Sequence, residues 1–288
     1  MACPPRLRAA LAPAAVLAAA TLPAAPDAAA QKAADVRRTA PMTSPYTHED
    51  SFINTGVRAY FIYHDFPTGG IIQGGNAKVY AVQARYAVTD TLQIVAYKDG
   101  YTEFDAGAVD DDGWNDIAAG LKWAFYQNED IGLFAAAGAG YEFGIGDDEA
   151  LQEDDEVRLW ASVDYEKDRF RVGLTGNFLI PTGDEDDLGD ATRFKWHARF
   201  NYAVTNWLTP TVELTGYHVL DEGDNTPLPF SGLDVANLGG GDDVVAIGFG
   251  SALHFTDELS FRAAYETELT NEDDLFGYRW TFSAVYEF

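Results

Sequence analysis

The sequence predicts an all-β fold, a transmembrane antiparallel up-and-down β-barrel of about 12 strands. Apolar and polar residues alternate over stretches of about ten residues, which is the period of a strand with two unlike faces. Short turns and long acidic connections succeed one another along the chain. After residue 30 there is no run of eighteen apolar residues, so a closed barrel is the remaining way to cross a bilayer.

Residues 1–30 have the pattern of a secretory signal peptide. Arg6 and Arg8 precede an Ala-rich apolar stretch at residues 9–20, and small residues at 28–30 offer a cleavage site before Gln31. The single cysteine, Cys3, lies in this leader, so we expect an exported chain without disulfides, thiolate nucleophiles or cysteine metal ligands. The leader and the strand pattern together predict residence in the outer membrane of a Gram-negative bacterium.

The chain is strongly acidic, with a formal net charge of −27 at pH 7, which argues against nucleic acid as a partner. Its carboxylates gather in runs at residues 110–112, 147–149, 153–156, 184–187 and 272–274. Such runs suit loosely bound Ca²⁺ or Mg²⁺, which could bridge the loops to lipopolysaccharide. The stretch 184–195 lacks an EF-hand pattern, because Leu188 and Lys195 stand at ligand positions. Solvated loops that bind no metal are the alternative, and no other cofactor is expected.

Residues 52–288 are expected to form the barrel. Short turns are predicted at residues 88–91, 127–130, 166–168, 204–206 and 255–258, and long connections at 67–76, 104–113, 146–155, 181–190, 221–242 and 270–274. Five short turns and six long connections join twelve strands, with the short turns periplasmic and the long acidic loops extracellular. The polar residues 31–51 are expected to form a periplasmic linker or a short plug.

Each predicted strand has one apolar face and one polar face. In residues 194–204, the even positions are mostly aromatic or aliphatic, whereas the odd positions include Lys195, His197 and Arg199. Aromatic residues beside the short turns suit the girdle of a membrane barrel at the lipid–water interface. These residues are Phe125, Tyr126, Tyr165, Phe170, Tyr202, Trp207, Phe255, Tyr286 and Phe288.

The alternation assigns a set of charged side chains to the lumen. The basic candidates are Arg58, Arg85, Lys122, Arg158, Arg171, Arg193, Lys195, His197, Arg199, Arg262 and Arg279, and the acidic ones are Asp116, Glu142, Asp164, Glu213, Glu266, Glu268 and Glu287. Charged side chains inside a barrel have to be paired, hydrated or both. They either brace the interior or set the solute preference of a pore. The ladder from Arg193 to Arg199 is the strongest candidate for selecting anions.

These features favour a channel or transporter that passes small solutes or ions through a narrow charged lumen, without covalent chemistry. Uptake of small hydrophobic or aromatic compounds is an alternative. A structural or adhesive barrel, or an outer-membrane hydrolase, is a further one. The hydrolase is disfavoured because none of the five histidines has a nucleophile and base arrangement at short range.

Two resemblances refine this prediction. The last strand, residues 277–288, resembles the C-terminal strand of outer-membrane barrels, which implies that Phe282, Tyr286 and Phe288 form a signal for the barrel assembly machinery. The stretch 113–125, with its Gly, Asp and aromatic pattern, and the strand end Leu179-Ile-Pro-Thr-Gly183 resemble the barrel family named for the MetA pathway of phenol degradation. That resemblance implies a barrel of the transport class, set among outer-membrane lipid and lipopolysaccharide, and it identifies no substrate.

Overall fold

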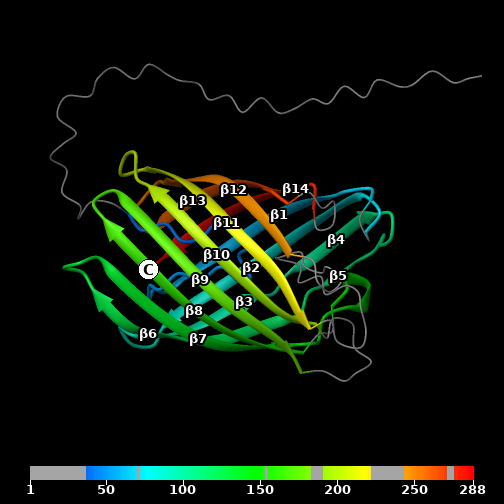
Figure 1. The fold of residues 1–288 in the computed structure, drawn as a ribbon, viewed down its shortest axis with the longest axis horizontal. Helices are drawn as coiled ribbons and strands as arrows, with labels where there is room; N and C mark the ends of the chain where they lie inside the picture. Colours follow the sequence, from blue (N-terminus) through cyan, green and yellow to red (C-terminus); the bar gives the residue numbers. More distant parts are fainter. Residues whose placement is uncertain (1–36, 70–71, 153–154, 183–190, 222–242, 271–275) are drawn as a thin grey trace, which may run out of the picture. The chain divides into compact units, whose positions relative to one another are not determined.

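The computed structural model describes residues 37–69, 72–152, 155–182, 191–221, 243–270 and 276–288. Fourteen strand segments form one antiparallel sheet (Figure 1). They are β1 (Gly56–Phe66), β2 (Gly75–Ala87), β3 (Leu92–Lys98), β4 (Tyr101–Ala106), β5 (Asp112–Trp114), β6 (Ile117–Asn128), β7 (Leu133–Phe143), β8 (Glu156–Lys167), β9 (Phe170–Pro181), β10 (Thr192–Tyr202), β11 (Leu208–Asp221), β12 (Asp243–His254), β13 (Leu259–Glu268) and β14 (Tyr278–Glu287). A short 3₁₀ helix, η3 (Asp148–Ala150), precedes β8. Within the described ranges, no helix is long and apolar enough to cross a membrane.

The sheet closes on itself, because β1 pairs with both β14 and β2. The segments β3 and β4 are two halves of one wall strand, since both pair with β2. In the same way, β5 pairs with β4 and β6 pairs with β3. The segments β5 and β6 are therefore two parts of the next wall strand, joined by residues 115–116. The wall therefore has 12 strands, and the predicted antiparallel up-and-down barrel is confirmed.

All five predicted short turns join consecutive strands, and the predicted long connections 67–76, 104–113 and 146–155 join the opposite strand ends. Most of the connections 181–190, 221–242 and 270–274 lies outside the described residues. Three of the short turns share one construction. Thr89, Thr205 and Thr256 each accept a hydrogen bond, at 3.0 Å, from the backbone N–H of the leucine three residues later. A threonine hydroxyl that bonds to its own backbone in this way stabilises a tight turn. The repeated Thr-x-x-Leu spacing therefore sets these hairpins locally.

The wall strand formed by β3 and β4 is interrupted at Asp99 and Gly100. Gly100 has a φ of 121°, a backbone conformation that side chains with a Cβ rarely adopt. The register against β6 also shifts between Ala96 and Lys98. Lys98 consequently turns inward together with Tyr97, although strict alternation predicts that it faces outward.

The two faces of the wall differ as the alternation predicts. Along β14, Arg279, Thr281, Ser283 and Val285 are buried, whereas the residues between them are partly or fully exposed. Every aromatic residue predicted to lie in a girdle beside the short turns is exposed on the outside of the barrel. An apolar outer face with aromatic residues at its rim is the pattern of a transmembrane barrel.

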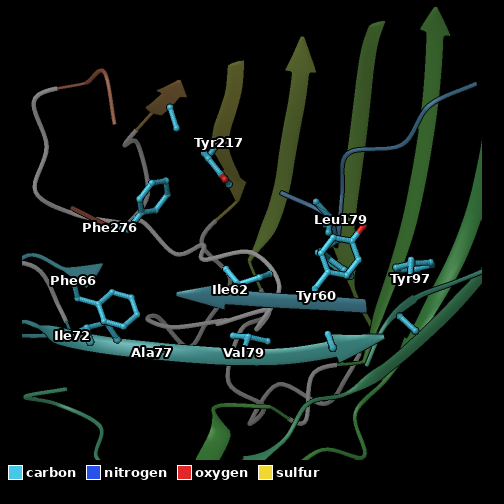
Figure 2. Packing of buried hydrophobic residues seen from close by; sticks show 14 of the residues in the cluster. Tyr60, Ile62, Phe66, Ile72, Ala77, Val79, Tyr97, Leu179, Tyr217 and Phe276 are labelled. Atoms are coloured by element: carbon cyan, nitrogen blue, oxygen red, sulfur yellow. The ribbon is translucent and has the colours of Figure 1, made fainter. Parts of the chain in front are cut away.

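The interior contains an apolar cluster toward the end with the long connections. It includes Ile62 and Phe66 of β1, Val79 of β2 and Phe276, which precedes β14 (Figure 2). Phe104 of β4 belongs to it as well. Leu179 and Tyr217 join it from β9 and β11. The lumen is therefore not uniformly polar. Apolar side chains fill part of the long-loop end, and many of the other buried side chains are charged or polar.

We predict that Leu174→Arg will destabilise the barrel in lipid bilayers by about 2–4 kcal/mol. Leu174 lies in the middle of β9 and is 55% exposed on the outer face. Its replacement would therefore place a cation in the hydrocarbon layer. The measurement is the free energy of unfolding in urea of protein refolded into vesicles. The control is Ile131→Arg, which makes the same change in a short turn and should cost far less. Equal costs would contradict a lipid-facing outer wall.

Candidate functional site

Two of the eighteen charged residues that the sequence assigns to the lumen, Glu268 and Glu287, lie at strand ends and are partly exposed. The interior of the barrel holds the other sixteen. Each is buried: Arg58, Arg85, Asp116, Lys122, Glu142, Arg158, Asp164, Arg171, Arg193, Lys195, His197, Arg199, Glu213, Arg262, Glu266 and Arg279. They come from strands on all sides of the wall. Their inward placement follows from the period of two, but whether they line an open pore stays a prediction.

A segment of the chain lies among these side chains. Residues 39–51, here called the inner segment, are all buried. They contact side chains of strands on opposite sides of the barrel, from β2 through β8, β10 and β12 to β14. A segment that contacts the wall on all sides has to lie in the lumen. Of residues 31–51, for which the sequence leaves a linker or a plug open, residues 39–51 thus lie in the interior, and residues 31–36 lie outside the described residues.

Arginine side chains hold the backbone of the inner segment. Arg158 donates hydrogen bonds to the carbonyl oxygens of Tyr46 and Thr47, at 2.5 and 2.7 Å. Arg199 donates to the carbonyl oxygen of Thr39 at 2.9 Å. An irregular segment has no ladder partner for its carbonyl groups, and a buried backbone group without a partner is costly. The inward arginines supply the missing donors.

Glu213 of β11 accepts hydrogen bonds from the donor groups of the inner segment. Its carboxylate accepts hydrogen bonds from the backbone N–H groups of Met42 and Thr43 at 3.0 and 2.7 Å, and from the Thr43 hydroxyl at 2.6 Å. His48 lies 3.6 Å from the same carboxylate, and its ring stacks on that of His197 at 4.6 Å between centroids. Wall and segment therefore match in hydrogen-bonding character over many positions.

Two glycines of β12 make room for the inner segment. A Cβ at Gly248 would lie 2.6 Å from Cγ2 of Thr43, and a Cβ at Gly250 would lie 2.9 Å from Sδ of Met42. Both distances are shorter than atoms in contact normally adopt. The small residues of this strand thus allow the segment to pack directly against the wall.

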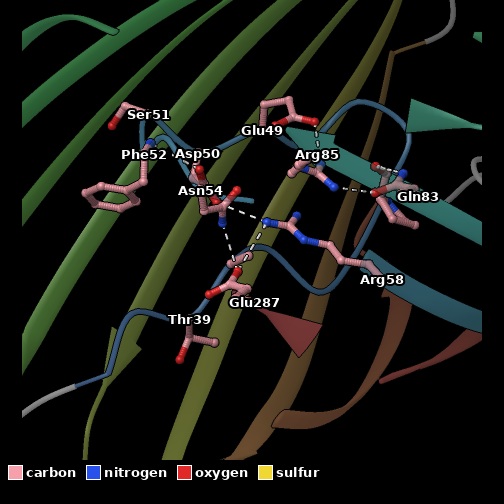
Figure 3. Close-up of polar contacts among 12 residues, drawn as sticks. Thr39, Glu49, Asp50, Ser51, Phe52, Asn54, Arg58, Gln83, Arg85 and Glu287 are labelled. Atoms are coloured by element: carbon pink, nitrogen blue, oxygen red, sulfur yellow. Dashed lines mark hydrogen bonds and ion pairs between the residues drawn. The ribbon is translucent and has the colours of Figure 1, made fainter. Parts of the chain in front are cut away.

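Two carboxylates of the inner segment lie against three cations of the wall. Glu49 accepts a hydrogen bond from Arg85 at 2.7 Å (Figure 3). Lys122 lies 3.5 Å from the second carboxylate oxygen of Glu49. Asp50 lies 3.4 Å from Lys122 and 3.7 Å from Arg58. We call Arg58, Arg85 and Lys122 the cationic cradle. All three cations and both carboxylates are buried.

The cradle alters the acidity of both carboxyl groups. Burial alone would raise the pKa of Glu49, but Arg85, Lys122 and Arg158 outweigh it and hold the pKa below its ordinary value. Burial opposes ionisation of Asp50 as well, but Lys122 and Arg58 lead the cations that keep its pKa well below the ordinary value. Both side chains are therefore anionic at neutral pH.

Both ends of the inner segment lie at the short-turn end of the barrel. Arg38 pairs at 3.2 Å with Glu166, which lies at the short-turn end of β8, and Arg37 pairs at 2.5 Å with Asp257 in a short turn. At the other end, Asn54 donates to Glu287 at 2.8 Å, just before β1 begins (Figure 3). The segment therefore enters and leaves the lumen from the same side.

The remaining wall charges are largely paired with one another. Arg199 bonds Asp164 at 2.6 Å, Arg193 pairs with Glu156, and Arg279 pairs with Glu266. Along the predicted ladder, His197 lies 2.9 Å from the Thr47 hydroxyl, and Lys195 lies over the rings of Tyr46 and Tyr217. All four basic groups of the ladder thus have contacts within the filled lumen.

Several residues of the site escaped the sequence analysis. Lys98 faces inward because of the irregular wall at β3, and it contacts Glu142 and Asp116. Glu156, counted in an acidic run, is the first residue of β8 and faces the lumen. Glu49 and Asp50 lie in a segment without periodicity, so no pattern could indicate their partners. Their negative charge, against the many cations predicted for the lumen, was a weak signal that they pair with the wall.

The acidic runs give no metal site in the part of the chain that the structure describes. No group of three or more histidines, cysteines or carboxylates that could hold a metal occurs there. Residues 110–112 and 147–149 lie within that part, whereas 184–187, 272–274 and Glu153 and Asp154 lie outside it. Metal binding by the loops therefore stays a prediction.

The predicted assembly residues lie on the outer face of the last strand or just beyond it. Phe288 is 76% exposed, and its ring packs edge-on against Tyr286 at 5.0 Å. Phe282 lies beside Phe61 of β1, where the barrel closes. Their role in assembly stays a prediction.

Comparison with known proteins supports the fold alone. No protein-family model matches the chain, and no curated protein matches it in sequence, so the resemblance to the phenol-degradation barrel family stays a prediction. The structure is similar to that of the NanC porin, with 10% identity, a TM-score of 0.51, and coverage of 81% of this chain and 99% of that one. It is also similar to the KdgM porin solved in complex with disordered oligogalacturonate, with 9% identity, a TM-score of 0.50 and the same coverage. The chain thus has the fold of outer-membrane porins.

We predict that the double variant Thr43→Cys/Gly248→Cys forms a disulfide that ties the inner segment to β12. A Cβ at position 248 would lie 3.7 Å from Cβ of Thr43, which suits the geometry of a disulfide. The only natural cysteine, Cys3, lies in the predicted leader, so no other thiol should compete. Mass spectrometry of the oxidised protein should show the crosslinked peptide pair. The two single variants are the controls, and free thiols in the double variant would contradict the placement of the segment.

A second prediction concerns acid. Both carboxyl groups have lowered pKa values in the folded protein, so their contribution to holding the segment is complete above the unfolded pKa of about 4 and is lost as the pH falls below it. Labelling of Thr47→Cys by 4,4′-dithiodipyridine should therefore speed up at acid pH. In the same background, Glu49→Gln/Asp50→Asn should label faster at neutral pH and lose most of this pH dependence. An unchanged pH profile in that variant would contradict the prediction.

Proposed function

We propose that this chain is an outer-membrane channel or transporter for small solutes whose lumen is closed by its own inner segment. The observation that carries the proposal is the character of the contacts between segment and wall. They are mostly hydrogen bonds and ion pairs to side chains, such as those of Arg158, Glu213 and Arg85. Water and polar solutes can replace such contacts, whereas they cannot replace apolar packing. A lumen of this kind can open and rehydrate.

The position of the inner segment supports the same proposal. Its two ends leave the lumen on the short-turn side, where the ion pair of Arg38 with Glu166 is partly exposed. Exposed ion pairs contribute little to stability, about 1 kcal/mol or less. Withdrawal toward the periplasm would break the polar contacts without unthreading the chain through the wall. The proposed activity involves no covalent chemistry.

The proposed surroundings follow from the outer face and the leader. The apolar outer wall supports contact with outer-membrane lipid, and lipopolysaccharide would meet the acidic loops. The barrel assembly machinery would bind the terminal strand through Phe282, Tyr286 and Phe288. None of these partners is needed for the channel itself to be tested in a planar bilayer.

A second candidate is uptake of small apolar compounds. It is favoured by the apolar cluster at the long-loop end and by a recess of about 660 Å³ beside the interruption of the wall at Asp99 and Gly100. Tyr80, Val82 and Trp114 line this recess from the outer face. An apolar solute could pass between the lumen and the lipid there. This second candidate function differs from the first in its solute, but both involve the same closed barrel and inner segment.

The redox state of Thr43→Cys/Gly248→Cys tests the channel. Oxidised protein in a planar bilayer should show no current steps, because the disulfide holds the segment in the lumen. After dithiothreitol, discrete steps should appear in the double variant, and more often when the pH is lowered. The single variants should show steps regardless of reductant. A folded, reduced protein without steps at any pH or voltage would refute the open-pore proposal.

A further inference from the structure

We propose that the cationic cradle is a binding site for the carboxylate groups of anionic solutes, and that Glu49 and Asp50 occupy it in the closed state. The inference rests on the proposed function, because the cradle is accessible to a solute only when the inner segment leaves. It assigns a solute class, small organic acids with one or two carboxylates, which the fold by itself does not indicate.

The first support is that the cations of the cradle belong to the wall, whereas their closest carboxylate partners belong to the inner segment. Arg85 and Lys122 belong to β2 and β6, and within the described residues their ion pairs are made with the inner segment. Arg58 has Asp50 as its nearer partner, at 3.7 Å, and the partly exposed Glu287 at 3.9 Å. By contrast, the wall cations Arg193, Arg199 and Arg279 pair with carboxylates of the wall itself. At the cradle the wall supplies cations and the segment supplies anions.

The second support is the charge balance of the whole interior. Among the described residues, eleven lysines and arginines are buried, against eight carboxylates. Two of those eight, Glu49 and Asp50, belong to the inner segment. Withdrawal of the segment would therefore increase the excess of positive charge along the wall. A charged constriction attracts ions of the opposite sign and sets the preference of a pore.

The third support is the geometry. Lys122 lies within 3.5 Å of both carboxylates, while Arg85 bonds one and Arg58 lies near the other. Ser162 donates to the carbonyl oxygen of Glu49 at 3.0 Å, and Thr175 donates to the same oxygen. Carboxylates that gain charged donors in a buried site form strong hydrogen bonds. The cradle thus holds two carboxylates at once, so its three cations are enough for both ends of a dicarboxylate.

The test uses the reduced Thr43→Cys/Gly248→Cys protein in a planar bilayer with a KCl gradient. Current steps test the proposed function, and the sign of the reversal potential tests this inference. We expect chloride to be favoured over potassium. In the background of that protein, Arg85→Gln/Lys122→Gln should move the reversal potential toward zero, and Arg85→Lys/Lys122→Arg should retain the preference. Steps with a preference for potassium would overturn the inference and leave the channel intact.

A matched control separates the lumen from overall charge. Lys78→Gln removes a cation from the same strand β2, but Lys78 is partly exposed on the outer face, where it pairs with Glu103. It should leave the reversal potential unchanged. A shift as large as that of the cradle variant would mean that surface charge sets the preference, and it would overturn the site.

Succinate and its neutral analogue succinamide provide the direct probe of binding. Succinate should shorten the open steps of the reduced protein in a concentration-dependent way, and succinamide at equal concentration should not. The effect of succinate should fall at least tenfold in potency in Arg85→Gln/Lys122→Gln and be regained in Arg85→Lys/Lys122→Arg. Equal effects of the two compounds, or an unaltered potency in the cradle variant, would refute a carboxylate site.

Discussion

The structure depends on one constraint, which is that charges inside a closed wall have to find partners. Eleven buried cations face inward from the described part of the barrel, and an unpaired buried charge costs several kcal/mol. Wall carboxylates such as Asp164 and Glu266 satisfy some of them. The inner segment satisfies others with Glu49, Asp50 and its own carbonyl groups. The lumen and the segment that fills it therefore form one electrostatic unit.

The size of the barrel makes this arrangement possible. Eight strands leave an interior that side chains alone fill, and sixteen leave a wide aqueous channel. Twelve strands leave room for a segment of chain between the side chains of opposite walls. Gly248 and Gly250 widen that space locally, since any larger residue would meet Thr43 or Met42. The inner segment packs closely against β12, whereas at the cationic cradle it contacts the wall through ion pairs.

The interior combines an apolar region and a cationic region, which would suit different solutes. The cluster around Phe66, Phe104 and Phe276 is apolar, whereas the cradle and the ladder of β10 are cationic. Tyr46 links the two regions, because it lies in the apolar cluster while its hydroxyl donates to Glu156 at 2.8 Å. An organic acid with an apolar body would meet favourable contacts in both regions. The two candidate functions, passage of polar solutes and uptake of apolar compounds, are therefore compatible with one another.

The amino-acid sequence by itself determined the barrel, because strand faces and turns are local properties. The period of two placed sixteen of the eighteen charged candidates inside, and the Thr-x-x-Leu turns marked where strands reverse. Only the tertiary structure decided which charges meet, because Arg199 and Asp164 are 35 residues apart and their approach depends on register. It also decided the inward turn of Lys98 and the place of residues 39–51. That segment has no periodicity, so its position is set only by the distant side chains that bind it.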